Sequence, residues 1–351
     1  MAGDLVVITG ITGFVATHVL LSTLRAPEQY RVRGTLRSVG KKQQILELLS
    51  EPDRARVEFA EVADTASSDL TDALKGATYV LHTASPYQIE IKDPRKELLE
   101  PAIHGTTNVL EYAAKEPSIK RVIITSSFAA VTDFKKGGPN RPNFTYKPSD
   151  WLTATEEDAV APGALGALSY SVSKKLAEKA AWDFVEANKP HFDIATINPP
   201  MIYGPTLQTG VRLANLNTSS KAIYQMIASA ETFPGDRLPL FAHVTDVADA
   251  HVLALSKPEA GGKRFLLQGS GVLTWGNAAL HISTKHPELK SRLPKGWEEA
   301  VQNRKGEDQY AKLDTSYARD ILGISFKDWE ETLEDALQSL LELEKRPEWK
   351  Q

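Results

Sequence analysis

The sequence predicts an α/β fold in which helices cover both faces of a doubly wound parallel sheet, followed by a smaller C-terminal subdomain. Short runs of β-branched residues alternate with longer amphipathic stretches through the first two-thirds of the 351 residues, and a glycine-rich turn follows the first run. Strands that alternate with helices of this length form parallel sheets with right-handed crossovers. Hydrophobic residues make up 42% and charged residues 25% of the chain, which is typical of a globular protein with a large core.

Six runs in this region have the composition of buried strands, and the stretches between them have helical patterns. The strands are expected at 5–9, 31–36, 57–62, 79–83, 121–125 and 194–197. The helices are expected at about 13–25, in a stretch that follows the second strand and runs up to residue 49, around 98–110 and at 169–188. A segment rich in Gly, Pro and Lys is predicted to form an exposed loop at 135–148.

The pattern is looser after residue 199. Helical stretches are expected at 221–230, 247–256, 275–285 and 329–343. In the last of these, apolar residues from Trp329 to Leu341 recur at helical spacing on one face. We therefore expect the C-terminal portion to form the smaller subdomain, with some segments returning to the large sheet.

The composition excludes several classes of function. The net charge of −4 gives no bulk electrostatic attraction to nucleic acid or to an anionic membrane. The absence of cysteine excludes thiolate metal sites and a cysteine nucleophile, and the eight histidines show no metal-ligand spacing, so no metal is expected. No apolar run approaches the roughly 18 residues needed to cross a bilayer. The first residues lack the basic region of a signal peptide, so we expect a cytoplasmic protein.

The turn after the first strand carries the spacing of a phosphate-binding loop. Gly10 would allow the tight turn, Gly13 would let the backbone approach a pyrophosphate, and Ala16 would let the next helix pack close to the strand. The free N–H groups and positive dipole end of that helix would face the phosphates. An ordinary strand-to-helix turn is the alternative, but the position at the start of an alternating α/β chain favours a nucleotide site.

The end of the second strand favours NADP over NAD. A protein that prefers NAD places an acidic residue about 20 positions after the loop, whereas positions 29–46 hold no Asp or Glu. Arg37 stands there instead, with Lys41 and Lys42 close behind, and a planar guanidinium suits a 2′-phosphate. Asp64, after the third strand, is placed to accept from the adenine amino group, and a solvated loop carboxylate is the alternative.

Two groups of residues have the pattern of proton-transfer chemistry. Tyr170 and Lys174 lie four residues apart at the start of a predicted helix, so they share a face. A nearby ammonium lowers the phenol pKa from its usual value near 10, which would let Tyr170 exchange a proton near neutral pH. An exposed helical pair is the alternative. Ser126 and Ser127 follow the fifth strand, at the edge where such sheets bind ligands, and we assign Ser127 to chemistry and Ser126 to local structure.

Together, the loop, the Tyr-x-x-x-Lys pair and the serine segment resemble the extended short-chain dehydrogenases/reductases. Four further segments are similar to the branch that contains dihydroflavonol reductase, the yeast methylglyoxal/isovaleraldehyde reductase and fungal aldehyde reductases: VLHTASP at 80–86, GTTNVL at 105–110, KKLAEKAAW at 174–182 and NPPMIYGP at 198–205. The resemblance covers residues 4–260 well and the C-terminal quarter loosely. One departure lies at 243–248, where HVTDVA replaces the Asp-Val-Arg-Asp-Val-Ala of many relatives.

The resemblance implies a Rossmann domain at 1–198 that binds NADP and carries the catalytic residues, and a mainly substrate-binding subdomain at 199–351, with segments near 239–268 returning to the large domain. It implies Ser127, Tyr170 and Lys174 as the catalytic triad. The implied contacts with NADPH are Gly10, Thr12, Gly13, Phe14, Val15, Arg37, Lys41, Asp64, Thr83, Ser85, Tyr170, Lys174 and Pro199. Asn108 matches a helix asparagine of the family, with capping or packing as its alternative role.

The expected activity is NADPH-dependent reduction of aldehydes, ketones or ketoesters to alcohols, with Tyr170 as the proton donor. The substrate is expected to lie against segments 86–91, 128–131, 163–168, 201–203 and 211–226. Within them, four bulky apolar side chains favour a small carbonyl compound with an alkyl or aryl group over a sugar nucleotide: Phe128, Leu165, Met201 and Tyr203. Packing between the two domains is the alternative role for these side chains.

Two other functions are compatible with this fold, because one fold hosts many chemistries. An NAD(P)-dependent epimerase or dehydratase would favour an acidic residue after the second strand, where this chain has Arg37. A non-catalytic NADP(H)-sensing module would not need the tyrosine–lysine pair. The sequence leaves the carbonyl substrate open and is compatible with a monomer or a homodimer.

Overall fold

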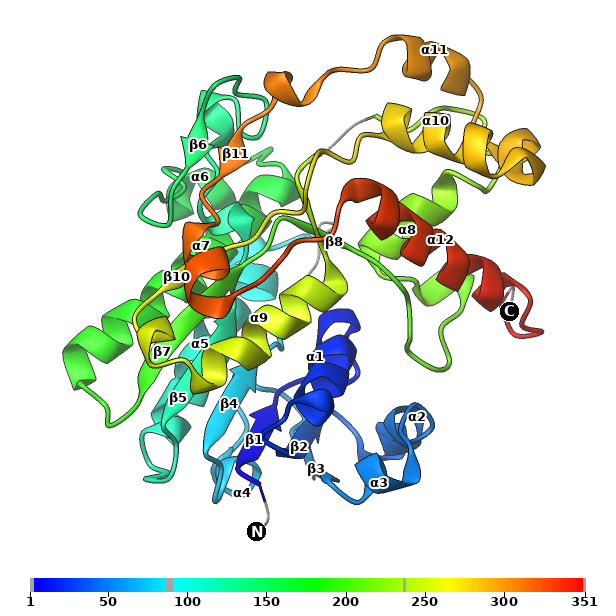
Figure 1. Ribbon diagram of the computed structural model, residues 1–351. Helices are drawn as coiled ribbons and strands as arrows, with labels where there is room; N and C mark the ends of the chain where they lie inside the picture. Colours follow the sequence, from blue (N-terminus) through cyan, green and yellow to red (C-terminus); the bar gives the residue numbers. More distant parts are fainter. Residues whose placement is uncertain (1–2, 86–90, 236–237, 350–351) are drawn as a thin grey trace.

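The computed structural model describes residues 3–85, 91–235 and 238–349. Its centre is a seven-stranded sheet in which every pairing is parallel, in the order β10-β7-β5-β4-β1-β2-β3 (Figure 1). The strands are β1 (Leu5–Ile8), β2 (Arg31–Leu36), β3 (Val57–Glu61), β4 (Tyr79–His82), β5 (Arg121–Thr125), β7 (Asp193–Asn198) and β10 (Arg264–Leu266). The predicted doubly wound α/β class is confirmed.

The two sides of the sheet are covered by different helices. All four residues of β1 are buried, and Val6 and Ile8 belong to one apolar cluster whereas Val7 belongs to another. Since successive side chains of a strand point to opposite faces, these clusters lie on opposite sides of the sheet. The helices that build the first cluster are α1 (Phe14–Arg25) and α9 (Val244–Ser256), and those that build the second are α5 (Glu100–Ala113) and α7 (Gly166–Asn188).

The strand order reverses at β1. From β1 it runs through β2 and β3 to one edge, and through β4, β5, β7 and β10 to the other. In doubly wound proteins, ligands bind beyond the carboxyl ends of the strands at such a reversal. A ligand site is therefore expected at the loops after β1, β4 and β5.

Shorter elements connect and extend this framework. The connecting helices are α2 (Lys42–Leu46), α3 (Glu51–Arg54), α4 (Thr71–Leu74) and α6 (Glu156–Val160). Two small parallel sheets pair β8 (Met201–Tyr203) with β9 (Phe241–His243), and β6 (Thr145–Tyr146) with β11 (Lys312–Leu313).

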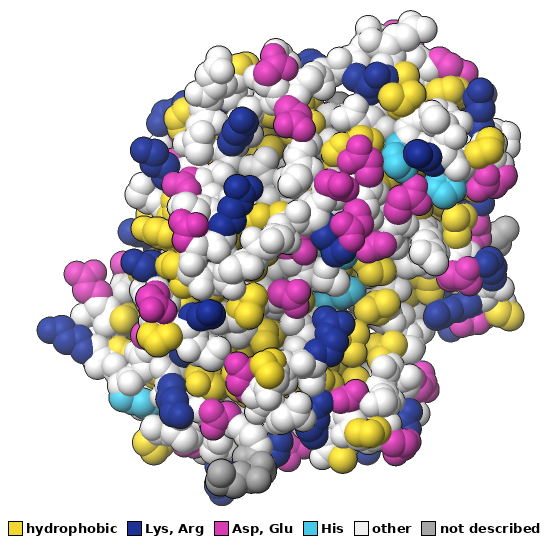
Figure 2. All heavy atoms as spheres, in the orientation of Figure 1, with side chains coloured by type: hydrophobic (Ala, Val, Ile, Leu, Met, Phe, Trp, Pro, Cys, Tyr) yellow, Lys and Arg dark blue, Asp and Glu magenta, His cyan; other side chains and the backbone are white. Residues whose placement is uncertain are grey.

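Figure 2 shows acidic and basic side chains interspersed over one face of the molecule.

A second group of helices packs beside the main sheet (Figure 1). They are α8 (Thr218–Gln225), α10 (Trp275–Lys285), α11 (Trp297–Gln302) and α12 (Trp329–Glu344). They enclose an apolar cluster of their own, in which Ile223, Ile282 and Leu337 are almost fully buried. The amphipathic pattern of α12 explains this placement, since its apolar face is covered by the other helices.

Most predicted elements lie where they were expected, and the differences have simple causes. The exposed loop predicted at 135–148 is wrong at its C-terminal end, because Thr145 and Tyr146 form β6 and the Tyr146 ring is buried against Phe128. The sequence pattern also missed β10, whose three residues are too few to show a period. The segment 86–90, part of a predicted substrate wall, lies outside the described residues.

Candidate active site

The turn after β1 leaves the first turn of α1 open for a ligand. Gly10 has φ +67°, and a Cβ there would lie 3.1 Å from the Cβ of Ala84. The helix cap is Gly13, which provides no side-chain hydrogen bond, and the first helical turn holds no acidic residue. Thr12, Phe14 and Val15 are half-buried around this turn. The arrangement therefore presents uncapped N–H groups and a positive helix end, both of which suit a pyrophosphate.

Two cations lie beyond the end of β2. Arg37 and Lys41 are exposed, and their side chains form no hydrogen bond or ion pair with the described residues. No acidic side chain neutralises Arg37 within this part of the chain. Both cations are therefore available to an anionic group at this edge of the sheet.

Asp64 and Asn108 organise the loop after β3. The carboxylate of Asp64 accepts hydrogen bonds from the Ala66 N–H at 2.9 Å and from the Ser67 hydroxyl at 2.9 Å. The Asn108 amide on α5 donates to the carbonyl oxygens of Thr65 and Ser68. Asn108 thus has the packing role that the sequence left open. Asp64 is exposed, and contact with adenine would add to its bonds within the loop.

Lys174 lies at the carboxyl-terminal ends of the neighbouring strands β4 and β5. It is only 7% exposed, and its ammonium donates to the Ser85 hydroxyl at 3.2 Å and to the Thr125 carbonyl oxygen at 3.1 Å. Burial lowers the pKa of Lys174 to about 8, while the negative charge of Glu178 acts in the opposite direction. The ammonium is thus held at the carboxyl ends of two neighbouring strands.

Tyr170 lies one turn before Lys174 on the same helix and is half-buried. The helix α7 packs against the short helix Phe128–Ala130 that follows Ser127. Helix geometry places residues i and i+4 on one face. The tyrosine and lysine that the sequence paired therefore share the side of α7 that meets the end of β5.

The two serines after β5 have different surroundings. Ser126 is 5% exposed and donates to the carboxylate of Glu178 at 2.5 Å. Ser127 is half-buried, and its oxygen accepts from the Ala129 N–H at 3.0 Å, while its hydroxyl hydrogen meets no acceptor among the described residues. A hydroxyl in this state can donate to a further oxygen. This arrangement supports the assignment of Ser127 to chemistry.

The remaining predicted cofactor residues tie neighbouring strand ends together. The Thr83 N–H donates to the Thr9 hydroxyl at 3.1 Å, and the Thr83 hydroxyl donates to the Thr9 carbonyl oxygen. The Pro199 carbonyl oxygen accepts from the Phe128 N–H at 2.8 Å. Thr83, Ser85 and Pro199 thus lie after β4 and β7, on either side of the β5 end.

The four predicted substrate residues are dispersed. Phe128 is 2% exposed in an apolar cluster with Tyr146, and Tyr203 is buried in the cluster of the C-terminal helices, with Met201 packed against it. Leu165 is 75% exposed just before α7. These contacts do not bring the four side chains into one wall.

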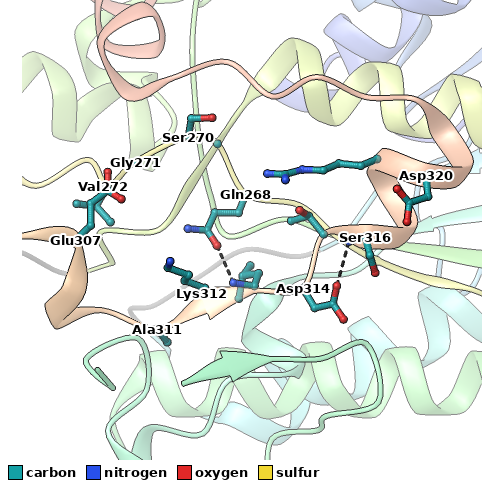
Figure 3. Close-up of a pocket in the computed structure, with 14 residues that line it drawn as sticks. Gln268, Ser270, Gly271, Val272, Glu307, Ala311, Lys312, Asp314, Ser316 and Asp320 are labelled. Carbon is teal, nitrogen blue, oxygen red and sulfur yellow. Dashed lines mark hydrogen bonds between the residues drawn. The ribbon is translucent and has the colours of Figure 1, made fainter. Parts of the chain in front are cut away.

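A cavity of about 600 Å³ lies beyond the end of β10, between segments 268–272 and 311–320 (Figure 3). Its lining mixes the acidic Asp314 and Asp320 with the basic Arg319, so its charge selects neither anion nor cation. None of the predicted catalytic or cofactor residues lines it. The cavity therefore has no part in the site at the ends of β1, β4 and β5.

Sequence reasoning missed two charged residues beside this site. Glu178 and Arg264 are almost fully buried and form an ion pair of 2.6 Å. Glu178 falls within the segment 174–182 that resembles the family, four residues after Lys174, and this helical spacing is the signal that could have identified it. Arg264 carries no such signal, because it lies on the missed strand β10.

The described part of the chain holds neither a cluster of metal-binding side chains nor a membrane-spanning helix. Residues 3–85, 91–235 and 238–349 contain no group of three or more His, Cys, Asp or Glu side chains arranged to hold a metal ion. Over the same residues, no helix combines the length and apolar character needed to span a membrane.

A parallel sheet with an open phosphate turn and a Tyr-x-x-x-Lys helix beside its reversal point defines the extended short-chain dehydrogenase/reductase class. The sequence profile of the NAD dependent epimerase/dehydratase family matches residues 6–267. The chain belongs to this family.

Relatives cover almost the whole chain. It is 36% identical over 345 residues to the ketoreductase azaE of Aspergillus niger, which covers 96% of this chain and 97% of that protein. It is 32% identical over 358 residues to the NADPH-dependent methylglyoxal reductase GRE2 of Saccharomyces cerevisiae, with 97% and 99% covered. The crystal structure of yeast methylglyoxal/isovaleraldehyde reductase Gre2 complexed with NADPH superposes with a TM-score of 0.84 at 31% identity, with 97% and 99% covered.

Proposed function

We propose that this protein is an NADPH-dependent reductase of aldehydes, ketones or ketoesters. The observation that carries the proposal is the position of Lys174: a buried ammonium held between the ends of β4 and β5, one helical turn from Tyr170, with a bond to Thr125 two residues before Ser127. The activities named for the ketoreductase and methylglyoxal reductase relatives support the same reaction class.

The residues present fit a dinucleotide with a 2′-phosphate. The uncapped start of α1 and the positive φ of Gly10 suit the pyrophosphate, with Gly13 allowing close backbone approach. Arg37 and Lys41 would hold the 2′-phosphate, since no described acidic side chain competes for them. The remaining contacts would come from Thr12, Phe14, Val15 and Asp64 on the adenosine and pyrophosphate side, and from Thr83, Ser85 and Pro199 around the nicotinamide.

When bound, NADPH supplies the hydride that reaches the carbonyl carbon. The Tyr170 hydroxyl donates the proton that the carbonyl oxygen gains. The Lys174 ammonium favours the phenolate form of Tyr170 and so makes that proton easier to release. The Ser127 hydroxyl donates a hydrogen bond to the same oxygen and stabilises the charge that develops there.

The substrate would lie between the nucleotide-binding part, residues 1–198, and the part that follows it. We assign one side to the segments that carry Phe128 and Leu165, and the other to those that carry Met201 and Tyr203. Because Phe128 and Tyr203 are buried, they would shape this site by packing more than by direct contact. The exposed Leu165 is the residue best placed to meet an apolar substrate at the entrance.

The direct test is NADPH oxidation, followed by absorbance, with a panel of aldehydes, diketones, β-ketoesters and flavonoid-like ketones, and with NADH in parallel. We expect substrate-dependent oxidation with a clear preference for NADPH. No oxidation with any member of the panel would favour an isomerase or a sensor. Equal rates with NADH would remove Arg37 from cofactor selection.

Location and assembly remain predictions. We propose a cytoplasmic enzyme that acts as a monomer or homodimer, with a small carbonyl compound as its partner. Cell fractionation tests the location, and light scattering coupled to size-exclusion chromatography gives the oligomeric state.

A further inference from the structure

The carboxylate of Glu178 is the centre of a buried polar network behind the catalytic residues. Glu178 is 1% exposed and lies on α7, one turn after Lys174. Donors from β7, β10, α7 and the residue after β5 reach its two oxygens: the Ser126 hydroxyl at 2.5 Å, the Asn198 amide at 2.8 Å, the Trp182 ring N–H at 3.3 Å, and the Arg264 guanidinium at 2.6 Å. The single hydroxyl hydrogen of Thr196 is shared between Glu178, at 3.1 Å, and the Asn198 side-chain oxygen, at 2.8 Å.

Arg264 connects this carboxylate to a distant loop. Its Nη1 atom donates to the carbonyl oxygens of Pro148 and Asp150, at 2.5 Å and 2.8 Å, and its guanidinium lies 3.7 Å from the centre of the Trp151 ring. The side chain is 9% exposed. A planar, always charged group with several fixed donors is suited to such a junction, and lysine is not.

A buried ion pair needs a reason, because desolvating two charges offsets much of their attraction. Replacing such a pair by apolar residues is often neutral for stability, whereas the complete set of hydrogen bonds here fixes one geometry. The groups that this geometry fixes are the ends of β5 and β7 and the helix α7. Of the proposed catalytic residues, Tyr170 and Lys174 lie on α7, and Ser127 lies two residues after the end of β5.

The network holds the backbone of Ser127 on two sides. Ser126, its chain neighbour, donates to one oxygen of Glu178, and the Asn198 amide bridges that same oxygen and the Ser127 carbonyl oxygen, which lies 3.3 Å away. With its backbone fixed in this way, the Ser127 hydroxyl has a defined position relative to α7. Loss of the carboxylate would release both supports together.

The network also acts on the charge of Lys174. The negative charge of Glu178 raises the pKa of Lys174 against the effect of burial. Another titratable group near this ammonium is His82 at the end of β4, and burial lowers the pKa of His82 to about 3, so it is neutral. Tyr170 lies one turn earlier than Lys174 on α7. The polar groups from β5 and α5 that line the same small space, on Thr125, Ser126 and Thr106, are uncharged.

We infer that Glu178 is a positioning residue of the active site, with Arg264 as its counter-ion: through Ser126 and Asn198 it fixes Ser127, and through α7 it supports the charged Lys174. This inference rests on the proposed reductase function. It adds a buried Glu–Arg pair to the Ser127, Tyr170 and Lys174 set, and the pair itself touches neither substrate nor cofactor.

The test compares Glu178→Gln with Glu186→Gln, which changes an exposed carboxylate on the same helix. For Glu178→Gln we expect kcat to fall about 10–100-fold, since small misplacements of reacting groups have effects of this size. We also expect kcat to begin its fall at high pH earlier than in the unmodified protein. This fall reports the loss of the Lys174 proton, and the pKa of Lys174 decreases once the negative charge of Glu178 is gone, so the alkaline limb of the kcat–pH profile moves to lower pH. NADPH affinity, measured by fluorescence titration, should change little. Glu186→Gln should match the unmodified protein in all three measurements.

A second variant distinguishes a loss of positioning from a loss of folding. Glu178→Gln leaves the Arg264 charge buried without its partner, which is strongly destabilising in other proteins. The double variant Glu178→Gln with Arg264→Met removes both charges, and the displaced alkaline limb should persist in it. If neither variant folds, the pair is a stability element and the inference is rejected.

The outcomes separate this inference from the function on which it rests. A folded Glu178→Gln with an unmoved alkaline limb and unchanged kcat would overturn the positioning role. If Tyr170→Phe, assayed in parallel, loses activity while Glu178→Gln does not, only the inference about Glu178 fails. If Tyr170→Phe keeps full turnover, the proposed reductase mechanism itself fails.

Discussion

The ammonium of Lys174 donates a hydrogen bond of 3.1 Å to the carbonyl oxygen of Thr125, 49 residues earlier in the chain. Thr125 ends β5, and its hydroxyl lies 2.7 Å from the Nε2 atom of His251 on α9. One residue therefore links the proposed catalytic helix on one face of the sheet to a helix on the other. The position of Lys174 thus depends on the central strands β4 and β5, whose residues are almost all buried.

Replacing Tyr170 by Phe removes the proposed proton donor and leaves the ring. We expect turnover with a reducible carbonyl compound to fall about 10²–10⁴-fold, the usual contribution of general acid catalysis. NADPH affinity should be largely kept, because the other cofactor contacts remain. Steady-state kinetics and a binding titration measure the two effects. Tyr317→Phe, which alters a tyrosine that is 37% exposed, is the control and should leave both unchanged.

Replacing Arg37 by Ala should weaken NADPH binding and spare NADH. A hydrogen bond to a charged group contributes about 1.5–3 kcal/mol, so the affinity for NADPH should fall about 10–100-fold. The measurement is the Kd of each cofactor. Arg31→Ala, at the opposite end of the same strand, is the control and should change neither value. Equal losses for the two cofactors would contradict a contact with the 2′-phosphate.

Replacing Gly10 by Ala should weaken both stability and cofactor binding. An L-residue at φ +67° is strained by about 1–3 kcal/mol, and its Cβ would also press on Ala84. Gly76 has a similar φ of +70° but open space around it, so Gly76→Ala should show the strain alone. Thermal unfolding with and without NADPH separates the two effects. Stabilisation by NADPH that is undiminished in Gly10→Ala would argue against a pyrophosphate at this turn.

Stability should fall as the pH decreases from 6.5 toward 5. Burial lowers the pKa of His18 and of His251 to about 4, and that of His82 to about 3, whereas histidines in the unfolded chain titrate near 6.5. Between these values the unfolded state binds more protons, so the folded state loses stability as pH falls. Each histidine should contribute up to about 1.4 kcal/mol per pH unit.

Urea unfolding at a series of pH values measures this dependence. His251→Gln removes about one proton from the difference in proton binding between the unfolded and folded states. The slope of the unfolding free energy against pH should therefore fall by up to about 1.4 kcal/mol per pH unit. His191→Gln, at an exposed position, should leave the slope unchanged. A free energy of unfolding that is constant from pH 6.5 to 5 would mean that these histidines titrate in the folded protein as they do in the unfolded chain, and would contradict the lowered pKa values.

The parts of the fold that could be predicted are those set by short-range geometry. The strand at 31–36 and the helix at 275–285 lie as expected, because a period of two or of 3.6 residues is determined by local sterics and side-chain spacing. The pairing of Tyr170 with Lys174 was predictable for the same reason. Short elements such as β6 and β10 were not, because two or three residues show no period and are held only by their neighbours.

The sequence by itself determined the alternation of strands and helices, the open phosphate turn at Gly10 and Gly13, and the spacing of the tyrosine and lysine. Only the tertiary structure decided that Glu178 pairs with Arg264, 86 residues away, and that Asp64 and Asn108 stabilise the same loop. The physical reason is that a local sequence pattern indicates which face of a helix or strand is buried. The residues that contact this face are determined by the order of the strands in the sheet. The support behind the active site is built from such partners.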